Sequence, residues 1–385
     1  MKRKCMYIVS MVIFMMALGL FFLPNNASAS PPSATLTVDG TLVGTYSSVQ
    51  EAVDAIETAA GQKCIVEIAE GTVSDPLDIK QFDGKHIVIK PQAGATVTFT
   101  NTITIDGLGD ISGPETLLVQ GLNFDFTAGS PAECINLDFV EARPGHCYPH
   151  NVTINGCTFK GVFNQVVAVQ SVPGGMRNIA IMNCTATDMH SLAQLKAVSG
   201  FAFIQNCTLS NADGGVNFYG PGDLIVDSCK FSVVGYAVRS GQGAGSISSL
   251  GSVDINNSVL NSNSSEDGTI VLRGDSTSNI NIIHSILTNA NSDGPSIQNL
   301  NAASESLYDI DIVESDVTGQ ITGINLGTIT TIDDPNVQNG PVDVVDHHQI
   351  EEMILPIFKI MLTIIIIVLI YDLIRWLFPC FSRPF

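Results

Sequence analysis

Residues 151–160 read NVTINGCTFK, and variants of this stretch recur along the chain every 22 to 35 residues. In each variant an alternating run such as Val152-Thr153-Ile154 leads into a turn residue, and the position after the turn, the marker, is usually Cys or Ser. Alternation with a period of two predicts a β-strand, and Asn or Gly predicts the turn that ends it. Recurrence at this interval predicts a repeat architecture. The marker positions are Leu122, Cys157, Cys184, Cys207, Cys229, Ser258, Ser285 and Ser315.

Most repeats carry a second apolar run after the marker, as in residues 216–219 and 270–273. A repeat of this length with two or three short strands matches one coil of a right-handed parallel β-helix. A single coil cannot bury its inner face, so coils must stack with neighbouring strands about 4.8 Å apart. The sequence therefore predicts an all-β, right-handed parallel β-helix (a solenoid) over residues 30–335. A β-sandwich with irregular hairpins is the alternative.

Residues 46–56 carry the one convincing helix signal of this region. Ser48 and Glu51 form a capping-box pattern, and Val49, Val53 and Ile56 repeat at helical spacing. We expect this helix to cap the open N-terminal end of the β-helix, because an uncovered sheet edge can pair with other chains.

The repeats at 183–185 and 206–208 (Asn-Cys-Thr), with the openings TLTVDG (35–40) and YSSVQEAV (46–53), resemble the pectin lyase-like β-helix superfamily. The resemblance covers residues 34–330 and implies the fold. It does not imply one activity, because this fold carries lyases, hydrolases, esterases, epimerases and adhesins. The catalytic signatures of the related hydrolases, esterases and pectate lyases are missing, and the single tryptophan, Trp376, lies in the C-terminal apolar segment. No catalytic residue is therefore transferred, and whether the chain is an enzyme stays open.

The two ends of the chain predict export and anchoring. Basic residues 2–4, the apolar run 6–23 and Ala27-Ser28-Ala29 predict a signal peptide over 1–29, with an uncleaved anchor as the alternative. Residues 353–378 predict a transmembrane helix, with an interfacial or buried helix as the alternative. An acidic linker (336–352) precedes this helix and basic residues follow it, so residues 379–385 are expected in the cytoplasm. We expect an exported protein on the extracytoplasmic cell surface.

Charge narrows the classes of partner. Lys and Arg number 17 against 37 Asp and Glu, for a net charge of -20, yet charged residues make up only 14% of the chain. That share lies below the roughly 25% of ordinary domains and excludes a disordered acidic tail or a coiled coil. Residues 30–352 hold 11 basic and 36 acidic residues. So acidic a region argues against nucleic acid as a binding partner, because phosphates require a positively charged surface. The same acidity favours the binding of divalent cations.

The repeated cysteines are expected to stack as free thiols inside the β-helix. Neighbouring strands put Cβ atoms about 4.8 Å apart, more than a disulfide normally has, and a linear ladder does not converge on a zinc ion. Cys134 and Cys147 differ, because they flank an insertion that lengthens one repeat. In an oxidising compartment we predict a disulfide between them, with two free thiols or a metal site that includes His146 and His150 as alternatives.

Polysaccharide-active β-helices use the outward faces of their parallel strands, so the strand after the marker is the candidate binding face. Lys196, Arg239 and Arg273 are three of the 11 exported cations, and alternation predicts them in one outward row. An acidic sugar such as a uronate is expected to bind such a row, with Tyr219 stacking on a ring. A solvated face with scattered cations is the alternative. The predicted binding residues are Lys196, Asn217, Tyr219, Arg239, Arg273 and Gln298.

Turn residues give a second candidate. Asp188 and Asn211 lie four places past their markers on adjacent repeats, and His190 and Asp213 lie six places past theirs. The two carboxylates predict a Ca²⁺ site or an acid–base pair, with a structural turn ladder as the alternative. The sequence requires no cofactor, and Ca²⁺ is the one that the acidic turns favour.

The leading hypothesis is that the protein binds extracellular polysaccharide or a cell-surface glycan, or mediates attachment. A polysaccharide lyase or glycoside hydrolase acting on acidic polysaccharide is the alternative, and a structural surface stalk is the second alternative. The identity of the glycan and the oligomeric state stay open.

Overall fold

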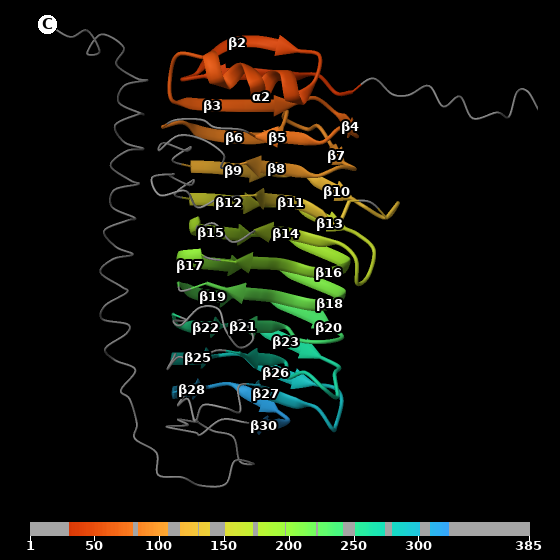
Figure 1. Ribbon diagram of the computed structural model, residues 1–385, viewed down its shortest axis with the longest axis vertical. Helices are drawn as coiled ribbons and strands as arrows, with labels where there is room; N and C mark the ends of the chain where they lie inside the picture. Colours follow the sequence, from red (N-terminus) through yellow and green to blue (C-terminus); the bar gives the residue numbers. More distant parts are fainter. Residues whose placement is uncertain are drawn as a thin grey trace, which may run out of the picture. The chain divides into compact units, whose positions relative to one another are not determined.

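The computed structural model describes residues 31–79, 84–106, 116–129, 131–138, 151–171, 176–196, 198–220, 222–241, 251–273, 279–300 and 309–322. These residues form an all-β, right-handed parallel solenoid whose coils stack in sequence order (Figure 1). The predicted signal peptide, linker, transmembrane helix and cytoplasmic tail lie outside these residues. Within the described ranges no helix combines the length and apolar character needed to span a bilayer.

One wall of the solenoid is a 12-stranded sheet. Its strands pair in parallel from β3 to β28, and each coil contributes one strand. Only β1 runs antiparallel, to both β2 and β3, among the pairings of this sheet that the structure describes. In order the strands are β2 (Thr41–Tyr46), β1 (Ala34–Val38), β3 (Lys63–Ile68), β6 (His86–Pro91), β9 (Thr116–Gln120), β12 (Asn151–Asn155), β15 (Met176–Met182), β17 (Val198–Gln205), β19 (Asp223–Asp227), β22 (Val253–Asn256), β25 (Asn279–Ile283) and β28 (Asp309–Val313).

The remaining strands form an 18-stranded sheet in which most coils contribute two short strands. Strands β16 and β18 are each 12 residues long, and β16 pairs with both β13 and β14, so it continues through a corner that other coils break. In chain order they are β4 (Gly71–Val73), β5 (Leu77–Ile79), β7 (Val97–Phe99), β8 (Ile103–Asp106), β10 (Asn123–Asp125), β11 (Glu133–Asp138), β13 (Thr158–Lys160), β14 (Val167–Ser171), β16 (Thr185–Lys196), β18 (Thr208–Tyr219), β20 (Lys230–Val233), β21 (Val238–Ser240), β23 (Val259–Ser262), β24 (Ile270–Leu272), β26 (Ile286–Asn289), β27 (Pro295–Asn299), β29 (Asp316–Thr318) and β30 (Gln320–Thr322).

The helix α2 (Val49–Thr58) packs against β1, β2, β3 and β5 at the N-terminal end, as predicted (Figure 1). Ser48 Oγ accepts a hydrogen bond from the Glu51 backbone N–H at 3.2 Å. The Glu51 carboxylate accepts from the N–H and hydroxyl of Ser47, one residue earlier than in a standard capping box. These bonds from Ser47 lower the pKa of Glu51. The apolar face of α2 is buried in the core, so the helix closes the end of the solenoid.

The markers lie inside the solenoid, as predicted: the four marker cysteines, Cys157, Cys184, Cys207 and Cys229, are at most 2% exposed and are free thiols. Each Cys or Ser marker donates from its side chain to the backbone carbonyl two residues earlier. Cys184 does so to Met182 at 3.2 Å, and Ser258 does so to Asn256 at 2.7 Å. This shared bond explains why Cys and Ser exchange at the marker, since both supply a small side chain with a donor.

The residue before the marker turns the chain. Asn183 and Asn206 have positive φ values of 54° and 50°, a conformation that Asn tolerates better than most residues. Their side chains also form a ladder, in which Asn206 donates to Asn183 and Asn183 donates to Asn155. The Asn of the repeat is therefore explained by the turn and by stacking of turns.

Candidate functional site

The strand register separates the predicted binding residues into two rows, and the first of them is largely buried, since Asn217 is 5% and Val271 0% exposed. Asn217 pairs with Arg239, Arg239 with Val271, and Val271 with Gln298. Lys196 pairs with Tyr219, and this pair lies two residues further along β16 and β18 than Asn217 does. The prediction of Lys196, Arg239 and Arg273 in one row is therefore corrected: Arg239 belongs to an inner row with Asn217 and Gln298, and Lys196 to an outer row with Tyr219.

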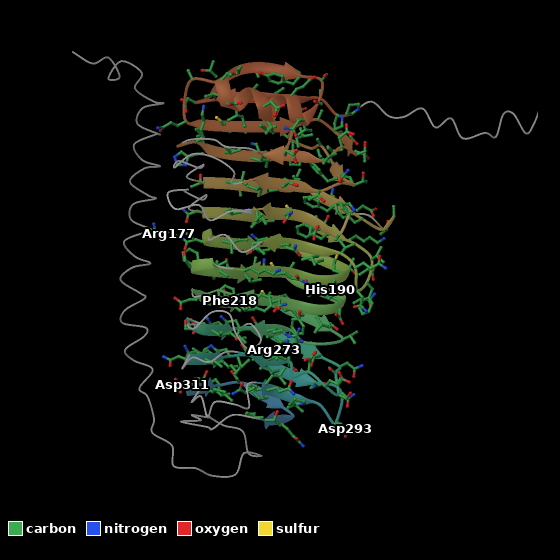
Figure 2. The ribbon with its side chains drawn as sticks, viewed as in Figure 1. Arg177, His190, Phe218, Arg273, Asp293 and Asp311 are labelled. Atoms are coloured by element: carbon green, nitrogen blue, oxygen red, sulfur yellow. The ribbon has the colours of Figure 1, made fainter. Side chains whose placement is uncertain are left out.

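Arg273 belongs to the outer row. It follows Leu272, whose register partner is Ser240, and Ser240 pairs with Phe218 next to Tyr219. Lys196, Tyr219 and Arg273 are all partly exposed, and Figure 2 labels Arg273 among the side chains of the solenoid. The outer row thus carries two cations on either side of an aromatic ring.

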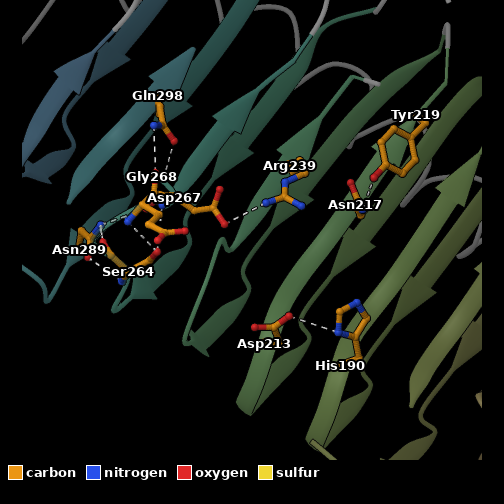
Figure 3. A network of polar contacts seen from close by, with 11 residues as sticks. His190, Asp213, Asn217, Tyr219, Arg239, Ser264, Asp267, Gly268, Asn289 and Gln298 are labelled. Atoms are coloured by element: carbon orange, nitrogen blue, oxygen red, sulfur yellow. Dashed lines mark hydrogen bonds and ion pairs between the residues drawn. The ribbon is translucent and has the colours of Figure 1, made fainter. Parts of the chain in front are cut away.

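Tyr219 is fixed in place by its neighbour in the inner row. Asn217, which is 5% exposed, donates from Nδ2 to the Tyr219 hydroxyl at 2.5 Å (Figure 3). The amide oxygen of Asn217 is buried, and no hydrogen-bond partner for it lies among the residues that the structure describes. A ring held by a buried amide loses little freedom when it binds a ligand, because its rotamer is already set.

Arg239 is engaged within the protein. Its Nη2 donates to Asp267 Oδ2 at 3.0 Å, and its guanidinium carbon lies 3.6 Å from the centroid of the Tyr236 ring. The side chain is only 15% exposed. Arg239 therefore does not offer a free positive charge to a ligand, and its role changes from the predicted binding residue to one that positions Tyr236 and Asp267.

Gln298 also acts within the protein. Its Oε1 accepts from the Gly268 N–H at 3.1 Å, and its Nε2 donates to the Glu266 carbonyl at 3.0 Å (Figure 3). Both bonds hold the turn that contains Asp267. Gln298 thus supports the partner of Arg239, which the sequence did not indicate.

The turn carboxylates do not face each other. Asp188 accepts a bond from Asn211, whereas Asp213 Oδ2 lies 3.3 Å from His190 Nδ1 (Figure 3). Within the described ranges no group of three His, Cys, Asp or Glu side chains is arranged to hold a metal ion. His190 is therefore the partner for the predicted acid–base role of Asp213, because a carboxylate beside an imidazole can orient the ring.

Tyr236 completes this cluster and was not singled out by the sequence. It is 5% exposed, and burial raises its pKa to about 12 despite the positive charge of Arg239. The ring lies over Gly214: a Cβ there would be 2.7 Å from the Tyr236 Cζ, so only glycine leaves room for it. We define the acid–base cluster as His190, Asp213, Tyr236, Arg239 and Asp267.

Cys134 lies in β11 and is fully buried, and burial raises the pKa of its thiol well above the usual value. Its predicted partner, Cys147, lies outside the described residues, as do His146 and His150. The disulfide stays a prediction.

No protein-family model matches the chain, and a search of curated proteins also found no match.

Proposed function

We propose that the protein is anchored in the membrane by residues 353–378, is displayed on the cell surface, and binds acidic extracellular carbohydrate through the outer row. The observation that carries the proposal is the pairing of Lys196 with Tyr219 on adjacent strands. Arg273 occupies the register position of Tyr219 two coils further toward the C-terminus. Membership of the pectin lyase-like superfamily is part of the same proposal and rests on the sequence resemblance.

The chemistry of the outer row fits an acidic sugar. An ammonium and a guanidinium group bind carboxylates through charge-assisted hydrogen bonds, and a tyrosine ring offers an apolar face to the C–H groups of a sugar. The rest of the exported region is strongly acidic, so an anionic chain is repelled elsewhere and its contacts concentrate at these cations.

A glycan array and calorimetric titration with oligouronates test the proposal. The variant Lys196→Ala/Arg273→Ala removes both cations of the outer row, and Tyr219→Ala removes the ring. Arg177→Ala/Lys230→Ala is a charge-matched control, because both residues are exposed and lie on β15 and β20, which carry no residue of the outer row. Figure 2 labels Arg177. We expect each outer-row variant to weaken binding at least tenfold and the control to bind like the wild type.

Equal loss in the control and the outer-row variant would show that only net charge matters and would refute the outer row. Absence of any glycan binding by the wild-type protein would reject the proposed function and favour a structural stalk.

A further inference from the structure

The outward face of the 12-stranded sheet carries a line of apolar side chains that neither the outer row nor the acid–base cluster uses. Ile65 pairs with Val88 and Val88 with Leu118, and the same register position continues along seven consecutive strands from β3 to β19. The side chains at this position are partly exposed, whereas their neighbours along each strand are buried in the core. We define the apolar stripe as Ile65, Val88, Leu118, Thr153, Ala180, Phe203 and Ile225.

The apolar stripe ends where acidic side chains begin. Ile225 pairs with Asp254, Asp254 with Asn281, and Asn281 with Asp311, which Figure 2 labels. Asn281 donates to Asp254 at 2.5 Å, so these polar side chains contact one another across the strands. Parallel sheets are usually covered on both faces, and an outward apolar row of this length marks a contact surface.

We propose that the apolar stripe binds a second copy of the chain, face to face, about a two-fold axis that runs along the strands beside Thr153. The two solenoids then run in opposite directions, so that β12 lies on β12 of the second copy and β3 lies on β19. The stripe meets itself over its whole length, in the pairs Ile65 with Ile225, Val88 with Phe203 and Leu118 with Ala180. This inference goes beyond the proposed function, because it concerns a different face of the solenoid and a protein partner.

The charges beside the apolar stripe favour a second copy as the partner. Lys63 and Asp223 share one register position, on β3 and β19 at the two ends of the stripe, and both are exposed. The two-fold axis brings Lys63 of each copy against Asp223 of the other. Lys90, which lies 3.1 Å from Glu67, is placed one strand from Asp227 of the second copy. Each copy therefore supplies the charge that the other one needs at both ends.

The acidic part of the face selects the antiparallel arrangement. Two copies running in the same direction would place each strand on its own counterpart, so Asp254 would face Asp254 and Asp311 would face Asp311. In the antiparallel arrangement β22 and β25 lie opposite β1 and β2, which contain no charged residue, and β28 lies beyond them. The acidic side chains are then kept apart, because like charges at close range cost free energy.

The size of the apolar stripe sets the strength of the contact. Seven strands span roughly 29 Å, and three outward residues on each strand span about 13 Å. The flat face of each copy is therefore ~400 Å², about half of the ~800 Å² per partner in a standard interface. We expect a reversible dimer with a Kd of roughly 1–100 µM.

Sedimentation velocity of the full-length protein in detergent, at about 1–200 µM, tests this interface. We expect the wild type to form dimers and Phe203→Asp to raise the dimer Kd at least about tenfold, because it places a charge in the apolar contact. Ile286→Asp is the matched control. Ile286 is also an exposed apolar residue but lies on β26 of the other sheet, so this variant is expected to keep the wild-type Kd.

A charge exchange tests the antiparallel arrangement and leaves the apolar stripe unchanged. Lys63→Asp and Asp223→Lys are each expected to raise the Kd about fivefold or more, and the double variant to return it to within about twofold of the wild type. Within one chain the two residues lie six strands apart, about 29 Å, well beyond the screening length. Only a contact between copies can therefore restore the dimer.

A wild-type protein that stays monomeric over this range would overturn the inference. A dimer that Phe203→Asp leaves unchanged would overturn it as well, because that dimer is held by another part of the chain. A double variant that dimerises no better than the single variants would refute the antiparallel arrangement. Binding of glycan to the outer row does not enter these measurements, so their failure leaves the proposed function intact.

Discussion

Replacement of Phe124 by Ala tests how strongly the solenoid depends on its stacked interior. The Phe124 ring is 1% exposed and lies between Phe99, at a centroid distance of 5.5 Å, and Phe159, at 4.9 Å. The Phe126 ring meets it edge-on. One substitution therefore removes the centre of a column that joins three consecutive coils.

The expected cost is large. Phe→Ala in a core costs about 3–5 kcal/mol, and each stacked aromatic pair contributes roughly 0.5–1.5 kcal/mol beyond its buried area. Strand β10 is hydrogen-bonded to β7 on one side and to β13 on the other, so the backbone cannot move in to fill the cavity. We therefore expect about 5 kcal/mol, the upper end of the range.

Urea unfolding of the full-length protein in detergent, followed by far-ultraviolet circular dichroism, measures this cost. Because coils contact only their neighbours, hydrogen exchange should rise mainly in β7, β10 and β13 and much less in β25. Phe201→Ala is the control, since that ring is 42% exposed, and it is expected to cost about 1 kcal/mol or less. A loss below about 2 kcal/mol for Phe124→Ala, or an equal loss for both variants, would refute the reasoning.

Three further predictions concern titration, thiols and the cap. The pKa of Tyr236 is raised from its ordinary 10.0 to about 12 in the folded state, so its contribution to stability is complete below pH 10 and is lost as the pH rises through about 12. Over that window the urea midpoint of unfolding should fall less steeply in Tyr236→Phe than in the wild type, and identical slopes would contradict this. The four buried marker thiols should resist thiol reagents in the native protein and react on unfolding, so rapid native labelling of the marker cysteines would contradict the ladder. Ser48→Ala should cost about 1 kcal/mol in urea unfolding, because the Glu51 N–H loses its acceptor, and no change would show that water replaces the cap.

The fold could be predicted because its signals are local. Asn183 predicts a turn and Cys184 predicts a small side chain that points inward, and both predictions concern contacts within one coil or with its neighbour. The helix cap was likewise predictable from Ser48 and Glu51. The shift of the Glu51 bonds to Ser47 was not, because it depends on the path by which the chain enters α2.

The binding rows were less predictable because turn lengths differ between coils. Asn217 and Arg239 each lie ten residues past their markers, but Val271 and Gln298, in the same row, lie 13 past theirs. Extra turn residues between β23 and β24, and between β26 and β27, cause this shift. The predicted single row rested on alternation, which fixes the face of a strand but not the position along it, so it placed Arg239 in one row with Lys196, two positions from its true row.

Only part of the acid–base cluster could be predicted from spacing. His190 and Asp213 share an offset from their markers in adjacent coils, which is a signal that could have paired them. The commitment of Arg239 to Asp267 and Tyr236 is different. It arises from a turn four residues before Val271 and from the space left by Gly214, and both require the folded chain.

The most direct test of the central claim is a crystal structure of the protein soaked with an oligouronate. The account predicts sugar density along the outer row, with a carboxylate at Lys196 or Arg273 and a sugar ring against Tyr219. Density seated on the 12-stranded sheet, or binding in solution that leaves the outer row empty in the crystal, would contradict it.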